Sequence, residues 1–117
     1  MNSKLYPIIA ESNRVFPEGA SIYEDDGKFH YVYMERGSES KHFIENNIME
    51  ILYYVFNDIT FSLAIKYELE HRNKIEDFRK ILFGKQLELL GNINMKYRKR
   101  RDEEISAILE KAPYQDL

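Results

Sequence analysis

The sequence predicts an α+β fold, mainly helical, in which a β-hairpin or a small antiparallel sheet packs on a bundle of about three helices. Two observations indicate this class. Residues 21–36 alternate with a period of two around an Asp-Asp-Gly turn, whereas from Asn47 onward the apolar residues recur with a helical period. No internal repeat, low-complexity tract or linker interrupts the 117 residues, so we expect one domain over residues 1–117.

The hairpin is predicted from two stretches, SIYE and KFHYVYMER, that flank Asp25-Asp26-Gly27. An Asp-Gly pair readily supplies the positive φ angles of a tight hairpin turn. Neither face of the second stretch is polar, so we expect both faces to be covered. Because an isolated two-stranded ribbon is marginally stable, this one must pack on helices or gain a strand from the N-terminal segment. Pro7 and Pro17 bracket IIAESNRVF, which is compatible with a short helix or an edge strand, and we expect FPEGA to be a loop.

A long helix is predicted from Asn47 to about Arg72. Asn47 followed by Glu50 is typical of a helix start, because the Asn side chain caps free amides and the Glu side chain reaches back to the cap. Much of the circumference is apolar, which indicates a central helix. Its apolar stripe comprises Ile48, Leu52, Val55, Ile59 and Leu63, widened by Ile51, Phe56 and Tyr67.

Two further helices complete the predicted bundle. Asn73 and Glu76 repeat the capping pattern, so we expect a second helix from Lys74, antiparallel to the first after a short connection. Gly91 either breaks this helix or allows close packing. The last helix is expected from Met95 to Lys111. The stripe of the second helix comprises Ile75, Phe78, Leu82, Leu89 and Ile93, with Gln86 in one turn of it.

The composition excludes several classes of protein. The chain has no cysteine, so it has no disulfide, thiolate metal site or cysteine nucleophile. No apolar run approaches the roughly 18 residues of a membrane span, and the N-terminus lacks the apolar stretch of a signal peptide. We therefore expect a cytoplasmic protein with no membrane partner, the alternative being a protein exported by a route that the sequence does not show. The net charge of −3 disfavours a general nucleic-acid-binding role.

No motif indicates catalysis, a cofactor or a metal site. The sequence contains no phosphate loop, nucleophile elbow or dinucleotide fingerprint. His30, His42 and His71 lack metal-ligand spacing with each other or with a pair of carboxylates. Most acidic pairs lie in predicted turns or helix starts, where they interact with free amides and the helix dipole. The least favoured interpretation is an enzyme that uses three carboxylates, Glu35, Asp58 and Glu68.

A basic stretch, Lys96 to Arg101 in KYRKRR, raises the alternative of a small nucleic-acid-binding or regulatory module. Acidic residues follow Arg98, Lys99 and Arg100 at a spacing of four, which is typical of ion pairs on one helix surface. Apart from Tyr97, no aromatic residue accompanies the stretch as a stacking platform. A solvated helix face is therefore favoured, with an acidic protein or nucleic acid as the alternative partners.

Charged residues among apolar ones are candidates for structural ion pairs. Glu68 and Arg72 have the spacing of a pair on one helix. Because buried charges need partners, we expect Arg36 to pair with Asp58 and to hold the hairpin against the long helix, while Gly37 allows a sharp turn. Alternatively, these residues bind a partner. The full set comprises Arg36, Asp58, Glu68, Arg72, Asp77 and Arg79.

Five segments, in this order and spacing, resemble the immunity protein 63 family of bacterial polymorphic toxin systems. Two positions differ from the residues that the resemblance leads us to expect, because Tyr54 replaces a tryptophan and Lys80 replaces a second arginine. A lysine does not reproduce a bidentate arginine contact. The segments are YVYMERG (31–37), ILYYVFNDIT (51–60), YELEHR (67–72), EDFRKILFGKQLELL (76–90) and ILEKAPYQD (108–116).

The resemblance implies a small cytoplasmic bacterial antidote that binds a toxin and blocks it without catalysing a reaction. A tyrosine-rich domain without catalytic motifs is compatible with such an inhibitor, because aromatic residues are enriched at interfaces. The tyrosines fit a core equally well. The candidate partner-binding surface is the hairpin edge, which comprises Tyr23, Asp25, Asp26, Tyr31, Tyr33 and Glu35.

Overall fold

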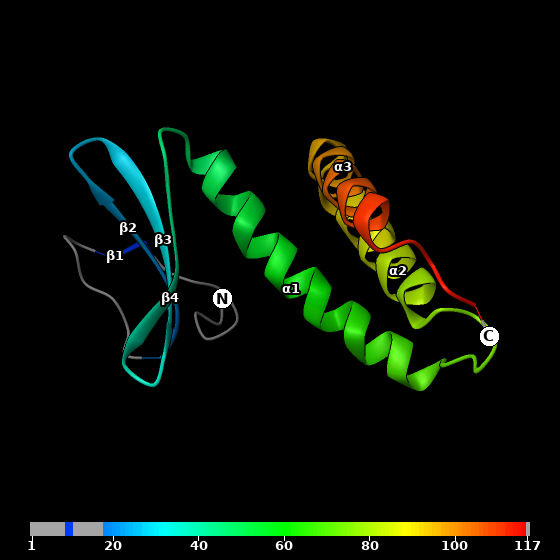
Figure 1. Cartoon of the computed structure of the whole chain (residues 1–117). Helices are drawn as coiled ribbons and strands as arrows, with labels where there is room; N and C mark the ends of the chain where they lie inside the picture. Colours follow the sequence, from blue (N-terminus) through cyan, green and yellow to red (C-terminus); the bar gives the residue numbers. More distant parts are fainter. Residues whose placement is uncertain (1–8, 11–17, 117) are drawn as a thin grey trace. The chain divides into compact units, whose positions relative to one another are not determined.

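The computed structural model describes residues 9–10 and 18–116 of the chain, which form a sheet and three helices (Figure 1). Of the residues that the structure describes, 57% are helical and 23% are in strands, which confirms the predicted α+β, mainly helical class. The chain divides into two compact units, Met1–Val55 and Phe56–Leu117, whose boundary falls within the first helix. The elements are β1 (Ile9–Ala10), β2 (Gly19–Asp25), β3 (Lys28–Glu35), β4 (Ser38–Glu45), α1 (Ile48–Glu70), α2 (Phe78–Ile93) and α3 (Met95–Lys111).

Two successive hairpins form the sheet of the first unit, whose strand order is β1-β2-β3-β4. The predicted hairpin is confirmed, because β2 and β3 pair antiparallel and their register closes with Asp25 opposite Lys28. Asp26 and Gly27 in the turn have φ angles of 53° and 76°. Two consecutive residues with positive φ match the right-handed twist of the flanking strands. The short β1 pairs parallel with β2.

The second hairpin explains why β3 ends at Glu35-Arg36-Gly37. Arg36 and Gly37 have φ angles of 52° and 79°, so they form another two-residue turn, and Glu35 pairs with Ser38. The sharp turn at Gly37 was predicted, but β4 was not. Its sequence, SESKHFIE, is mostly exposed and has little apolar alternation. An edge strand of this kind is stabilised by its backbone pairing with β3, which leaves no apolar pattern to detect.

One face of the sheet packs against the start of α1. Tyr31, the central residue of this face, is 1% exposed and pairs with Phe43 on β4. The rings of Phe43 and Tyr54 stack with their centroids 4.0 Å apart, and the Tyr54 hydroxyl donates a hydrogen bond of 2.7 Å to Glu45 Oε2. Tyr54 therefore joins the aromatic layer to the edge strand β4. A tryptophan at position 54 has no hydroxyl group and could not form this hydrogen bond.

The second unit is a packing of α2 and α3 with the later part of α1. Its apolar core comprises Ala64 of α1, Leu82 and Phe83 of α2, and Ile105 of α3. Asn94 is the single residue between α2 and α3. It ends α2, and its side chain caps α3 by accepting a hydrogen bond of 2.8 Å from the Lys96 amide. The predicted limits of the last helix, Met95 to Lys111, are confirmed.

Gln86 is a polar residue at the centre of this second unit. It is 0% exposed and joins all three helices. Its Nε2 group donates to the carbonyl oxygen and the Oδ1 atom of Asn57 at 3.1 and 2.9 Å and to Thr60 Oγ1 at 3.3 Å. Its Oε1 atom accepts a hydrogen bond of 3.0 Å from Arg101 Nε. The amide that interrupts the apolar stripe of α2 is thus fully paired.

The predicted start of α2 is wrong by one turn. Asn73 does accept hydrogen bonds from the amides of Ile75 and Glu76, at 2.8 and 3.4 Å, but no helix follows it. The residue that caps α2 is Asp77, whose carboxylate accepts from the Arg79 amide. Residues 74–77 are therefore a loop. The apolar stripe predicted for α2 is wrong at three positions, because the following side chains are exposed: Ile75, Phe78 and Ile93.

Gly91 allows close packing and does not break α2, which continues to Ile93. A Cβ atom at position 91 would lie 3.1 Å from Arg98 Cδ and 3.2 Å from Arg98 Nη1. Contacts this short between Cβ and other heavy atoms are rarely observed. The missing side chain therefore makes room for the arginine of the neighbouring helix.

Helix α1 is long and apolar enough to cross a membrane by length and composition alone, a criterion that core helices also meet. Its residues Ile51, Tyr53 and Val55 are buried in the first unit, and Ala64 lies in the core of the second. Yet only 28% of its most apolar window is buried. The helix thus has core contacts along its length and also carries exposed apolar side chains.

Candidate functional site

The acidic part of the predicted binding surface is exposed. Asp25 and Asp26 lie at the β2–β3 turn, with Glu24 beside them, and all three side chains face solvent. We call these three residues the hairpin tip. Glu35 is also exposed, but it lies at the opposite end of β3, in the pair with Ser38. The hairpin tip and Glu35 therefore do not form one continuous acidic cluster along β3.

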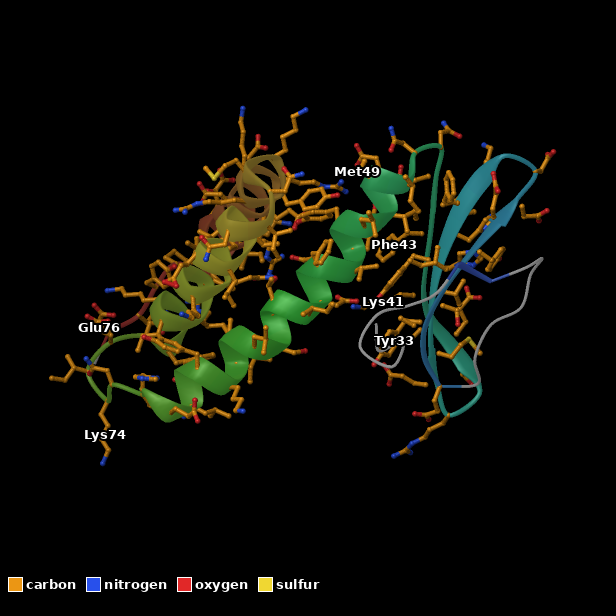
Figure 2. The ribbon with its side chains drawn as sticks, turned by 180° about the vertical axis from the view of Figure 1, so that it is seen from behind. Tyr33, Lys41, Phe43, Met49, Lys74 and Glu76 are labelled. Atoms are coloured by element: carbon orange, nitrogen blue, oxygen red, sulfur yellow. The ribbon has the colours of Figure 1, made fainter. Side chains whose placement is uncertain are left out.

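The aromatic part of that prediction is wrong at two positions. Tyr31 and Tyr23 are 1% and 7% exposed, so both belong to the core of the first unit. Tyr23 stacks on the His30 ring at 4.5 Å, and burial, with smaller effects of Asp25 and Glu39, raises the pKa of its hydroxyl. Tyr33 is half-buried, with the Lys41 ammonium group 5.9 Å from its ring centroid (Figure 2).

Arg36 has a clear local role in its turn. Its side chain is exposed, and its backbone amide donates a hydrogen bond of 2.8 Å to Glu18 Oε1. Asp58 belongs to the second compact unit. A contact between Arg36 and Asp58 would therefore join the two units, and it stays a prediction, as does the alternative that Arg36 binds a partner.

The Glu68–Arg72 pair is present at the end of α1. Arg72 donates from Nε to Glu68 Oε2 at 2.9 Å and from Nη2 to Oε1 at 2.8 Å. Only 4% of the Glu68 side chain is exposed, against 53% of Arg72. The hydrogen bonds from Arg72 lower the pKa of Glu68, while burial alone would raise it. The pair thus fixes a guanidinium group at the surface.

Three exposed apolar side chains lie near Arg72 in the sequence, and one of them, Phe78, also lies near its guanidinium group. Leu69, Ile75 and Phe78 are 61%, 66% and 49% exposed, and the Arg72 Cζ atom lies 5.7 Å from the centroid of the Phe78 ring. We call Leu69, Arg72, Ile75 and Phe78 the corner surface. Lys74 and Glu76 flank it in the α1–α2 loop (Figure 2). The sequence pattern missed this surface because it placed Ile75 and Phe78 in the apolar stripe of a helix that begins at Lys74.

Asp77 and Arg79 hold the C-terminal segment to the start of α2. Arg79 forms a salt bridge of 2.8 Å with Asp77 and donates from Nη1 and Nη2 to the carbonyl oxygens of Ala112 and Pro113, at 2.8 and 2.9 Å. The Asp77 carboxylate also accepts from the Gln115 amide at 2.9 Å. Hydrogen bonds from the Arg79 side chain and from the backbone amides of Gln115 and Arg79 hold the pKa of Asp77 well below its usual range.

The end of the chain makes a second set of contacts with the same turn. Asp116 accepts from the Asp77 amide at 2.9 Å and from Lys80 Nζ at 2.7 Å, which lowers the pKa of its carboxyl group. Two cations lie near the Tyr114 ring, with Arg79 Cζ at 5.5 Å and Lys80 Nζ at 5.7 Å from its centroid. Lys80 thus binds Asp116 through one hydrogen bond from its ammonium group, and this contact does not require the bidentate guanidinium group of an arginine.

Part of the basic stretch on α3 makes contacts within the second unit, whereas Lys96, Arg98 and Lys99 are exposed. Tyr97 is 7% exposed and packs near Phe56, so it offers no stacking platform. Arg101 donates to Gln86 and to Glu104 Oε1. Arg100 lies 3.8 Å from Glu104 Oε2, which is one of the predicted pairs at a spacing of four. These contacts favour a structural helix face over a nucleic-acid surface.

Within residues 9–10 and 18–116, no three side chains of the metal-binding types gather closely enough to hold a metal ion. The three carboxylates of the enzyme interpretation also occupy separate places, Glu35 in a strand of the first unit, Asp58 in the middle of α1 and Glu68 in an ion pair at its end.

Residues 25–107 match the family model described as Immunity protein 63. The chain belongs to the immunity protein 63 family. Toxin neutralisation is the general function of such immunity proteins, and a toxin is their partner. No curated protein and no solved structure matches this immunity protein.

Two of the resembling segments of this immunity protein meet in one structural feature. The segment at residues 76–90 contributes Asp77 and Arg79, and the closing segment at residues 108–116 contributes the carbonyl oxygens that Arg79 holds. The segment at residues 67–72 contributes the Glu68–Arg72 pair. The chain thus uses these segments to order the loop between α1 and α2, and this ordered loop carries part of the corner surface.

Proposed function

We propose that this immunity protein neutralises a cognate toxin by binding the toxin domain directly, without catalysing a reaction, in the cytoplasm of the bacterium that makes both proteins. The observation that carries the proposal is the corner surface. It combines exposed apolar side chains with an aromatic ring and an arginine, the combination that is enriched at the centres of protein interfaces. The family supplies the partner, because immunity proteins act on toxins.

The corner surface is already ordered in the free protein. Arg72 is held by two hydrogen bonds to a buried carboxylate, so it loses little side-chain freedom on forming an interface. The loop that carries Ile75 is ordered by Asn73 at one end and by Asp77 at the other. A preformed surface of this kind retains more of its contact energy as affinity, because less ordering occurs on binding.

The hairpin tip is a second candidate contact, with a different physical role. Its three exposed carboxylates create a local negative field at a turn. A field of this sign increases the rate of encounter with a positively charged toxin domain, more than it increases the lifetime of the complex. Tyr33 and Glu35 stay candidates for contacts on the first unit, whereas Tyr23 and Tyr31 act in its core.

Affinity measurements on two double variants test the proposal. The toxin-bearing protein is first captured from the source bacterium with the tagged immunity protein, and its toxin domain is then produced separately. Replacing Ile75 and Phe78 by serine should weaken binding by at least about a hundredfold, because two central apolar anchors are each worth about 2 kcal/mol. An affinity within about threefold of the unsubstituted protein would exclude the corner surface.

The matched control replaces Ile93 and Met95, which are 44% and 64% exposed at the α2–α3 turn, by serine. This control should retain full affinity, and both double variants should retain the thermal midpoint of the unsubstituted protein. Charge reversal at Asp25 and Asp26 should lower the association rate most strongly at low salt. An association rate that charge reversal leaves unchanged would exclude the hairpin tip from the encounter.

A further inference from the structure

Two histidines of neighbouring strands face each other on the sheet face opposite to Tyr31. His30 of β3 and His42 of β4 lie on this face, and their Nδ1 and Nε2 atoms are 2.9 Å apart. Tyr23 of β2 pairs with His30 in register, and its ring stacks on the imidazole at an interplanar angle of 10°. The two imidazoles are therefore in direct hydrogen-bond contact across the β3–β4 pair.

A β-bulge brings a carboxylate to the same face. The register of β3 with β4 shifts between Tyr33 and Met34, so that Glu39 pairs with Met34. A bulge of one residue redirects the following side chain to the other face of a strand. Glu39 consequently lies on the face of His42, and its Oε1 atom is 3.2 Å from His42 Nδ1.

The direction of these hydrogen bonds follows from the carboxylate. An ionised Glu39 only accepts, so His42 Nδ1 must carry a proton. In a neutral imidazole the other nitrogen is then an acceptor, so His42 Nε2 accepts a hydrogen bond and His30 Nδ1 must donate it. When both histidines are neutral, only one set of hydrogen-bond directions is therefore possible, and both rings carry their proton on Nδ1.

Acid adds protons to the two histidines that link these hydrogen bonds. One added proton is accommodated on His30 Nε2, because His30 Nδ1 continues to donate to His42. A second added proton would have to occupy His42 Nε2, where it would face the N–H group of His30 at a nitrogen separation of 2.9 Å. Two donors cannot share one hydrogen bond, so the second proton breaks the contact between the strands.

We propose that the hydrogen bonds among His30, His42 and Glu39 form a pH-sensitive contact between β3 and β4, which we call the clasp. The clasp stays closed when one proton is added and opens when a second proton binds. Other titratable groups on this face, assigned by strand register, are Tyr23 and Asp25 of β2 and Lys28 of β3. The device belongs to the sheet of the first unit and does not depend on the proposed toxin surface.

Nitrogen NMR of the histidine rings tests the hydrogen-bond directions. At about pH 8, where unperturbed histidines are neutral, both His30 and His42 should show a protonated Nδ1 and an unprotonated Nε2. Either ring carrying its proton on Nε2 would overturn the clasp. His71 of the second unit is the internal reference, because its Nδ1 atom lies 2.9 Å from the Tyr67 carbonyl oxygen.

The pH dependence of stability tests the proton count. From about pH 6 down to the pH at which the clasp opens, the unfolded chain binds one proton more on these two rings than the closed sheet does, so the unfolding equilibrium constant should rise about tenfold per pH unit. The His42→Gln variant should lack this slope, and the His71→Gln control should keep it. Parallel curves for the unsubstituted protein and His42→Gln would overturn the proposal.

Discussion

Replacing Gln86 by methionine tests how the second unit is held together. Methionine has nearly the same length as glutamine, so the substitution removes the polar end of the side chain and leaves little cavity. Gln86 is fully buried and makes four hydrogen bonds with Asn57, Thr60 and Arg101. The variant therefore isolates the energy of these bonds from the energy of packing.

The expected magnitude follows from the individual partners. Thr60 loses little, because its hydroxyl group already donates to the Phe56 carbonyl oxygen at 2.7 Å. Arg101 loses a bond from a charged donor, typically about 1.5–3 kcal/mol, but its side chain is 13% exposed and recovers part of this from water. Asn57 loses a neutral bond to its side chain, about 1 kcal/mol. The sum predicts a loss of about 2–4 kcal/mol in the free energy of unfolding.

Urea denaturation, followed by circular dichroism, measures this loss directly. The control is Glu103→Met, which introduces the same side chain at an exposed position of α3 and should change the free energy of unfolding by less than about 0.5 kcal/mol. A loss below about 0.5 kcal/mol for Gln86→Met would refute the reasoning, because it would mean that water replaces every bond at no cost.

Three further predictions concern the C-terminal contacts, acid and α2. Arg79→Lys loses the fork that holds two backbone carbonyls, so amide hydrogen exchange at Gln115 should accelerate at least about tenfold, and unchanged exchange would contradict the contact. The pKa values of Glu68 and Asp77 are lowered in the folded state, so their stabilisation is complete above about pH 4.5 and is lost as the pH falls below about 4; denaturation midpoints that do not change on acidification would disprove this. Gly84→Ala should stabilise the protein by about 0.5–1 kcal/mol, because Gly84 is helical and open space surrounds the added methyl group, whereas a loss of stability would mean that the site is crowded.

Local signals in the sequence predicted much of the fold. The Asp26-Gly27 turn and the limits of α3 were predictable because each depends on residues close in the chain, a turn dipeptide in one case and a capping asparagine in the other. The start of α2 depends on distant residues. Asn73 and Asp77 both cap amides, but the Asp77 turn is also held by Asp116, 39 residues later. No local pattern contains that contact.

The candidate site was less predictable, for a different reason. Tyrosine is suited to a core and to an interface alike, so the type of residue could not decide that Tyr23 and Tyr31 are buried while Tyr33 is partly open. The Glu68–Arg72 pair was predictable from its helical spacing. The exposure of Phe78 beside that pair was not, because it depends on where the helix begins.

A stoichiometric titration is the most direct test of neutralisation by binding. Increasing amounts of the immunity protein are added to a fixed amount of the purified toxin domain, and the remaining toxin activity is measured after short and long incubation. We predict that activity falls linearly and disappears at one fixed molar ratio, independent of time, because a binder occupies each toxin molecule that it blocks. Inactivation of many toxin molecules by each immunity protein, increasing with time, would contradict the proposal and indicate catalysis.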